Sequence, residues 1–150
     1  MTVVEALQRC SLFKDFTETG LKIFAGIAAE KTIPAGSPLF VENMVGESLF
    51  IVKSGTVRIS QRVDGADREI LLVGPGEHLG GLAILSKTVR LASAVAVTPC
   101  EVLELAHRDY IRLQPEKPQA CLKLALALAA DLAARAAESR DLLQRLAAPR

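Results

Sequence analysis

The chain has 150 residues, of which 50% are hydrophobic and 23% charged, with 18 Lys and Arg against 17 Asp and Glu. This length holds one domain with a real core, and the composition excludes a disordered chain. A formal net charge of +1 gives no electrostatic reason to expect a nucleic acid or an anionic membrane as a partner. No apolar run reaches the roughly 18 residues of a membrane span, and the first residues lack the pattern of a secretory signal.

Cys10, Cys100 and Cys121 are far apart in the sequence and match no zinc-ligand spacing. We expect them to be free thiols in a reducing, cytoplasmic compartment, with Cys100 in the core. The chain has no Trp and only 4% aromatic residues, so a ligand site is not expected to be an aromatic cage.

Residues 1–31 are predicted to be helical. Thr17 can cap a helix that presents an apolar face at three-to-four spacing, formed by Leu21, Phe24, Ala25 and Ala28. A short leading helix and a turn are expected before it.

Residues 32–106 are cut into short segments by Gly and Pro and are rich in β-branched residues. The apolar run 49–52 is typical of a strand covered on both faces. The next strand is predicted to alternate between an apolar and a polar face: Val57, Ile59 and Val63 against Arg58, Ser60 and Arg62. Asp64-Gly65 predicts a hairpin turn before the apolar run 70–73. This pattern predicts a mainly β fold with flanking helices, as an antiparallel sandwich, barrel or jelly roll.

Residues 107–150 are predicted to be helical again, with Pro115 and Pro118 interrupting before a long stretch over 120–148. Its apolar stripe comprises Leu128, Leu132, Ala136, Ser139, Leu143 and Leu146, and its opposite side carries Asp131, Glu138, Arg140, Asp141 and Arg145. At about 1.5 Å per residue such a helix is roughly 40 Å long, more than a small roll covers. We therefore predict a homodimer through this C-terminal helix; the alternative is that the helix folds back on its own domain.

The glycine-dense segment 74–85 is the strongest candidate for a binding site. Gly80 and Gly81 allow a close backbone approach to a ligand, and a helical turn over 82–85 would add its dipole to an anion site. Arg90 could supply the charge and the planar fork that suit a phosphate. The alternative is a sheet corner with a surface arginine.

The chain resembles the cyclic nucleotide-binding domain, which is the sensor domain of the catabolite activator protein family and of the protein kinase A regulatory subunit. The resemblance covers about residues 10–135, through Ser11-Leu12-Phe13, Ala35-Gly36-Ser37-Pro38-Leu39-Phe40, the run from Gly46 to Val57, Pro75-Gly76, Leu79-Gly80, Leu82-Ala83-Ile84-Leu85, Arg90, Ala92-Ser93 and Cys100-Glu101-Val102-Leu103. It implies an eight-stranded jelly roll (a double-stranded β-helix) between helices, with a phosphate-binding cassette over 79–95.

The resemblance also implies a ligand site. Arg90 would pair with the cyclic phosphate, backbone N–H groups at Leu91 and Ala92 would help to hold it, and Arg135 would lie near the base. The implied ligand-binding residues are Gly80, Gly81, Leu82, Ala83, Arg90, Leu91, Ala92 and Arg135. The family has a glutamate where this chain has Gly81, and that glutamate accepts the ribose 2′-hydroxyl. Its loss removes about 1.5–3 kcal/mol, or roughly one to two decades of affinity.

The sequence thus predicts a stand-alone regulatory or sensor domain for a cyclic nucleotide, cAMP or cGMP, with no catalytic residues and no metal site. Related transcription factors append a winged helix-turn-helix after this helix, and with the last residue at Arg150 direct operator binding is not expected. Two alternatives stay open: a ligand-free dimeric scaffold that acts through an unidentified partner protein, and a small metal-dependent jelly-roll enzyme. The enzyme is disfavoured because His78 and His107 are the only histidines in the sequence. Both are expected at the surface or as capping residues, and a ligand contact is the alternative for His78, which lies beside the cassette.

Overall fold

Short helices begin the chain in this computed structural model, which describes residues 1–140, 144 and 147. They are α1 (Val3–Arg9), the 3-10 helix η1 (Ser11–Phe13) and α2 (Glu18–Ala25). Thr2 and Glu5 form a capping box at α1. The predicted cap at Thr17 is present, because its hydroxyl accepts a hydrogen bond of 3.2 Å from the backbone N–H of Gly20.

The helical region ends before residue 31, the boundary that the sequence predicted. Helix α2 ends at Ala25, and Ala28, expected on its apolar face, begins strand β1 (Ala28–Ile33). Strand β1 pairs along its whole length with β10 (Cys100–Ala106), from Ala28 opposite Leu105 to Ile33 opposite Cys100. The backbone hydrogen bonds of this ladder outweigh the weak helical spacing of the apolar residues.

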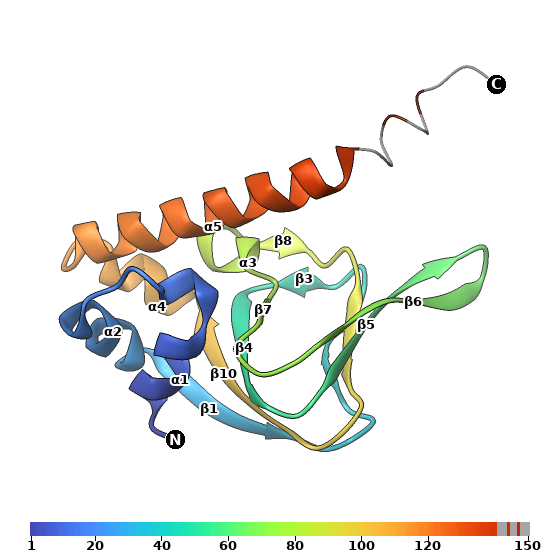
Figure 1. Ribbon diagram of the computed structural model, residues 1–150, viewed down its shortest axis with the longest axis horizontal. Coiled ribbons are helices and arrows are strands. Elements are labelled where there is room, and N and C mark those ends of the chain that lie inside the picture. The colour runs from blue at the N-terminus through green and yellow to red at the C-terminus, as the bar shows by residue number, and fades with distance from the viewer. Residues whose placement is uncertain (141–143, 145–146, 148–150) are drawn as a thin grey trace.

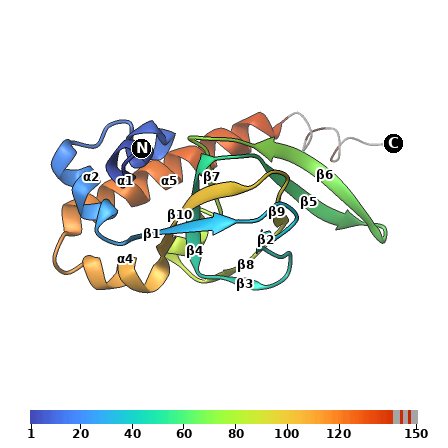
Figure 2. The same cartoon turned by 90° about the horizontal axis from the view of Figure 1, so that it is seen from below.

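Between β1 and β10 the described chain forms β2 (Pro38–Phe40), β3 (Val45–Gly46), β4 (Ser48–Ser54), β5 (Val57–Val63), β6 (Ala66–Val73), β7 (His78–Leu79), the short helix α3 (Leu82–Leu85), β8 (Thr88–Val89) and β9 (Ser93–Ala96). Two four-stranded antiparallel sheets have the orders β1-β10-β4-β7 and β2-β9-β5-β6, and β3 pairs with β8. The predicted mainly β roll with flanking helices is therefore confirmed. The N-terminal helices α1 and α2 lie at one end of the roll, and the β5–β6 hairpin projects from the other end (Figures 1 and 2).

Strand β4 is buried on both faces, as the apolar run 49–52 predicts. Leu49 and Ile51 belong to the core under the helices, whereas Phe50 and Val52 belong to the core between the two sheets. This alternation follows from the period of two in a strand. Strand β4 therefore contributes side chains to both cores, the one under the helices and the one between the two sheets.

Strand β5 departs from simple alternation. Its register shifts between Ile59 and Ser60, so that Ser60 is buried and Val63 is exposed. A bulge moves the following side chains to the other face of a sheet. The predicted hairpin turn is present: Asp64 and Gly65 both adopt positive φ, at 54° and 78°, as a two-residue turn of this type requires.

Two helices follow the roll, α4 (His107–Leu113) and α5 (Pro118–Glu138). Pro118 occupies the first turn of α5, where a missing N–H costs nothing. Helix α5 lies along one side of the roll (Figure 1) and buries Cys121, Leu124 and Leu128 against the helical core. Leu143 and Leu146 of the predicted stripe lie outside the described residues. None of the described helices is long and apolar enough to cross a membrane.

Candidate functional site

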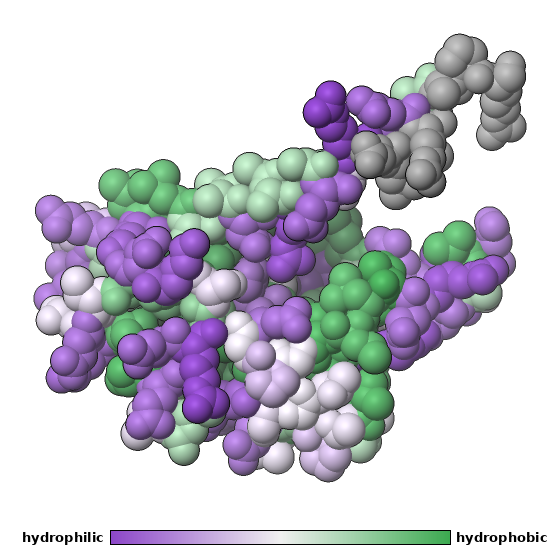
Figure 3. Space-filling view, viewed as in Figure 1, coloured by the Kyte–Doolittle hydropathy of each residue, from purple (hydrophilic) through white to green (hydrophobic). Residues whose placement is uncertain are grey.

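A pocket of about 630 Å³ lies between the roll and α5. The segment around β7 and α3, the segment after β8 and one face of α5 form its walls, and hydrophobic surface gathers on the roll below α5 (Figure 3). All of the predicted site residues line it: Gly80, Gly81, Leu82, Ala83, Arg90, Leu91, Ala92 and Arg135. The helical turn that the sequence predicted over 82–85 is α3.

Arg90 is the buried cation of this pocket. It is 6% exposed, so the alternative of a surface arginine is wrong. Its Nη2 donates a hydrogen bond of 2.7 Å to the backbone carbonyl oxygen of Ser48, and its Nη1 donates one of 3.4 Å to that of Gly80. The guanidinium carbon lies 4.2 Å from the centre of the Phe40 ring and 6.0 Å from that of Phe50. Carbonyls and ring faces thus hold the charge in place.

Two glycines make the room that this guanidinium occupies. A Cβ on Gly46 would overlap the Nε of Arg90, and a Cβ on Gly80 would overlap Nη1. Gly80 also has a φ of 70°, a backbone angle that residues other than glycine rarely adopt. The main chain of Arg90 is fixed as well, because its N–H donates to Met44 and its carbonyl accepts from Asn43, both at 2.8 Å.

No carboxylate of the described residues contacts the charge of Arg90. Within the described residues its polar contacts are backbone oxygens, and its buried Nε has no hydrogen-bond partner. Burial lowers the pKa of Arg90, and the negative charge of Glu104 acts in the opposite direction. A buried guanidinium with an unused N–H is suited to receive an anion, because an anion satisfies both the charge and the donor.

The backbone around Arg90 offers further donors. Among the backbone hydrogen bonds of the described residues, none is donated by the N–H of Leu91 or of Ala92. Leu91 is 78% exposed, so its backbone lies near the pocket mouth. The N–H of Ala83, by contrast, already donates to the carbonyl of Gly80 at 3.0 Å. Ala83 therefore lines the pocket, and its N–H is not free to donate to a ligand.

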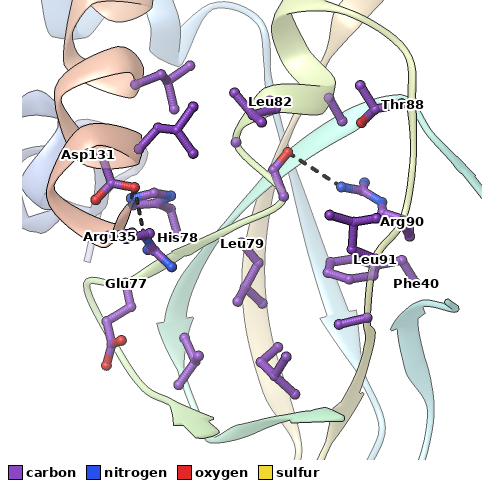
Figure 4. A pocket seen from close by; sticks show the side chains of 18 of the residues that line it. Phe40, Glu77, His78, Leu79, Leu82, Thr88, Arg90, Leu91, Asp131 and Arg135 are labelled. Atoms are coloured by element: carbon purple, nitrogen blue, oxygen red, sulfur yellow. Dashed lines mark hydrogen bonds and ion pairs between the residues drawn. The ribbon is translucent and has the colours of Figure 1, made fainter. Parts of the chain in front are cut away.

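A second polar group faces the pocket from the side opposite Arg90 (Figure 4). His78 is only 7% exposed, so the prediction of a surface or capping residue is wrong for it. Its Nε2 lies 3.5 Å from Oδ2 of Asp131, and the same oxygen accepts a 2.8 Å hydrogen bond from Nε of Arg135. Desolvation lowers the pKa of His78, with Arg135 adding to this and the charges of Asp131 and Glu77 opposing it.

Asp131 is the site residue that sequence reasoning missed. It was predicted on the polar side of α5, yet it lines the pocket. The signal was present: Asp131 follows the buried Leu128 by three positions, and residues at that spacing share a helix face. Arg135, one turn further, reaches the pocket rim with its side chain more than half exposed.

His107 has a structural contact. It is the first residue of α4, and its Nδ1 lies 2.7 Å from the backbone oxygen of Ile84, which joins α4 to α3. Residues 1–140, 144 and 147 contain no group of three or more His, Cys, Asp or Glu side chains that could hold a metal ion.

Gly81 lies directly under α5. Its φ is −53°, which any residue can adopt. A Cβ there would lie 2.7 Å from Cδ2 of Leu128 and 3.7 Å from Nδ1 of His78. A side chain at position 81 therefore requires Leu128 to move. Glu77 does not fill the gap, because its carboxylate accepts a 3.2 Å hydrogen bond from the N–H of Gly74 within a turn.

Solved structures share this architecture. A crystal structure of the Thermus thermophilus catabolite activator protein superposes with a TM-score of 0.80 at 34% identity, covering 91% of this chain and 62% of that one. The regulatory domain of Toxoplasma gondii PKA, co-crystallised with cAMP, gives a TM-score of 0.68 at 32% identity over 74% of this chain and 42% of that one. The first is a catabolite activator protein and the second a protein kinase A regulatory domain, the two groups that the sequence resembles.

Sequence comparison agrees. A cyclic AMP receptor protein of Thermus thermophilus is 35% identical over 122 residues, which is 73% of this chain and 56% of that protein. The chain thus spans about half the length of this relative. Residues 30–115 match the family model for the cyclic nucleotide-binding domain. With the roll, the pocket and these matches together, the chain belongs to the cyclic nucleotide-binding domain family.

Proposed function

We propose that this chain is a regulatory sensor domain that binds a cyclic nucleotide, with the cyclic phosphate at Arg90. One observation carries the proposal: a buried guanidinium that has no carboxylate partner within the described residues lines a largely apolar pocket. Apolar walls with a few placed polar groups are typical of small-molecule sites, and about 630 Å³ is within their usual range.

A cyclic phosphate suits this environment better than a free phosphate dianion. It carries one negative charge, which one guanidinium can balance without a second cation. The N–H groups of Leu91 and Ala92 can donate to its other oxygens, because no described backbone group accepts from them. The base would lie against α5, where Leu132 and Arg135 line the pocket.

Cyclic AMP is the first ligand to test. The Thermus relative is named as a cyclic AMP receptor, and the Toxoplasma neighbour was solved with cAMP. Cyclic GMP is the competitor, because its base differs while its sugar and phosphate are the same. The side chains that line the pocket near α5 would decide between them.

Isothermal calorimetry with cAMP and cGMP tests the proposal. We expect saturable binding that Arg90→Ala weakens at least tenfold, because a charge-assisted hydrogen bond is worth about 1.5–3 kcal/mol. Arg112→Ala is the matched control, since Arg112 is an exposed arginine on α4 whose ion pair is with Asp109, outside the pocket. Thermal unfolding of each variant separates lost binding from lost folding. An absence of heat with wild type at millimolar nucleotide contradicts the proposal.

The proposed role is regulatory and involves no catalytic step. We also propose a cytoplasmic location, which the three buried free thiols support, because free thiols are typical of reducing compartments. A partner that reads the state of the sensor would contact it through α5 or the pocket mouth.

A dimeric scaffold is the second candidate function. Leu122 and Leu126 lie one turn apart on α5 and are 60% and 61% exposed. Exposed leucines at this spacing form an apolar stripe that a second copy of α5 could cover. Light scattering tests it: we expect a dimer that Leu126→Asp splits, with Ala134→Asp, at an exposed position of the same helix, as a control for the added charge. A monomeric wild type contradicts this candidate.

A further inference from the structure

We propose that Nδ1 of His78 accepts a hydrogen bond from a hydroxyl group of the bound ligand, and that Asp131 holds the imidazole in the tautomer that makes this possible. The inference rests on the proposed function and names a specificity-determining residue of the same pocket.

The unpartnered state of Nδ1 is the first observation. His78 is 7% exposed, and its Nδ1 is buried without a hydrogen-bond partner among the described residues. A buried polar atom without a partner is costly, and in native structures it usually marks a position where another group binds. His78 lines the same pocket as Arg90.

The tautomer follows from the neighbour on the other ring nitrogen. Nε2 lies 3.5 Å from Oδ2 of Asp131. An ionised carboxylate can only accept, so Nε2 must carry the proton, and the neutral ring then has its lone pair on Nδ1. Arg135 donates to the same carboxylate oxygen at 2.8 Å and thereby keeps Asp131 in place. Nδ1 is therefore an acceptor and not a donor.

Gly81 places a single movable group beside the acceptor. A Cβ at this residue would lie 3.7 Å from Nδ1 and 2.7 Å from Cδ2 of Leu128, so the leucine methyl fills the space next to the ring. A leucine methyl is the far end of a flexible side chain, and it can turn aside when a polar group enters.

The two ends of the pocket together define the ligand chemistry. Arg90 offers donors to an anion, and His78, on the opposite side of the pocket, offers an acceptor to a hydroxyl (Figure 4). A sugar cyclic phosphate carries both groups on one rigid ring system. In a 3′,5′-cyclic ribonucleotide the 2′-hydroxyl is the single free sugar hydroxyl, so this is the group that His78 would select.

Calorimetry with cAMP and its 2′-deoxy analogue tests the inference on the full chain. We expect wild type to bind cAMP about fivefold to tenfold more tightly than the deoxy analogue, the usual worth of one neutral hydrogen bond. His78→Leu should bind the two ligands equally. His78→Asn, which keeps a polar atom near the place of Nδ1, should retain part of the preference and controls for folding.

The outcomes separate the two proposals. If wild type binds both nucleotides equally while Arg90→Ala weakens binding at least tenfold, the role of His78 is wrong and the proposed function stands. If His78→Leu keeps the preference, the role of His78 is also wrong. If neither nucleotide binds to wild type, the proposed function and this inference fall together. Nitrogen NMR provides a readout independent of affinity: a proton on Nδ1 of His78 in the free protein overturns the inference.

Discussion

The guanidinium carbon of Arg90 lies 4.2 Å from the centre of the Phe40 ring, on the wall of the pocket. An aromatic face stabilises a cation without neutralising it. Arg90 is thus oriented before any ligand arrives, and its charge remains available because no carboxylate in the described part of the chain contacts it. Preorganised charge of this kind reduces the cost of binding, because the side chain loses little freedom when the anion enters.

Gly46→Ala should reduce the affinity for the cyclic phosphate by at least tenfold. The new methyl group would overlap Nε of Arg90, so the guanidinium must leave the position in which it is held. Calorimetry with cAMP measures the loss. Gly74→Ala is the matched control, because no atom lies within 4 Å of a Cβ there. Equal affinity in the two variants would show that the position of Arg90 does not matter for binding.

The sequence was most informative where local chemistry determines the structure. The Asp64-Gly65 turn, the doubly buried strand β4 and the helical turn α3 all formed where predicted. The turn, β4 and α3 depend on a few neighbouring residues. The predicted site residues line one pocket, because Gly80 and Gly46 leave the room that the guanidinium of Arg90 occupies.

Features that depend on distant pairing were missed. The start of β1 at Ala28 is determined by β10, which lies more than seventy positions later in the chain. The burial of His78 depends on the approach of α5, since Asp131 and Leu128 cover it. The residues around His78 in the sequence do not predict that a helix much later in the chain will cover its side chain. Asp131 alone could have been placed correctly, from its spacing to Leu128.

The stability of the protein should fall as the pH drops below about 6.5. Burial lowers the pKa of His78 in the folded state, so the unfolded chain binds a proton first, near its ordinary pKa of 6.5. Stability is complete above that value and is lost as the pH falls toward the folded pKa. Asp131 and Glu77 moderate the effect, and Arg135 strengthens it.

Urea unfolding at several pH values between 5 and 7.5 measures this loss. His78→Gln should show a smaller dependence on pH over the same range, because the buried titrating group is gone. His107 remains in both proteins and controls for the other histidine. An identical slope in wild type and variant would show that His78 is not the responsible group.

Native protein should resist thiol reagents. Desolvation raises the pKa of Cys10 to about 11, and burial also raises the pKa of Cys121. The thiolate is the reactive form, so at pH 8 the labelling of Cys10 should be slower than that of an ordinary thiol by about a hundredfold or more. All three cysteines are buried and free, so all three should react in denaturant. Rapid labelling of the folded protein would show that the helices that bury Cys10 and Cys121 open readily.

Gly81→Glu should raise the affinity for cAMP by about tenfold, provided that Leu128 makes room. A carboxylate is a stronger acceptor for a hydroxyl than a neutral imidazole, because hydrogen bonds to charged groups are worth about twice as much. The φ of −53° at Gly81 accepts a side chain without strain, and only Cδ2 of Leu128, at 2.7 Å from the new Cβ, opposes it.

The double variant Gly81→Glu with Leu128→Ala separates these two effects. Calorimetry should show the full gain in the double variant and a smaller gain in Gly81→Glu alone, with Leu128→Ala alone as the control. The new carboxylate would also favour the charged form of His78 beside it, so the pKa of His78 should rise in both Glu variants, which NMR titration measures. If the double variant binds cAMP no more tightly than Leu128→Ala, position 81 does not contact the ligand hydroxyl, and the pocket holds its ligand through Arg90 and the walls of α5 alone.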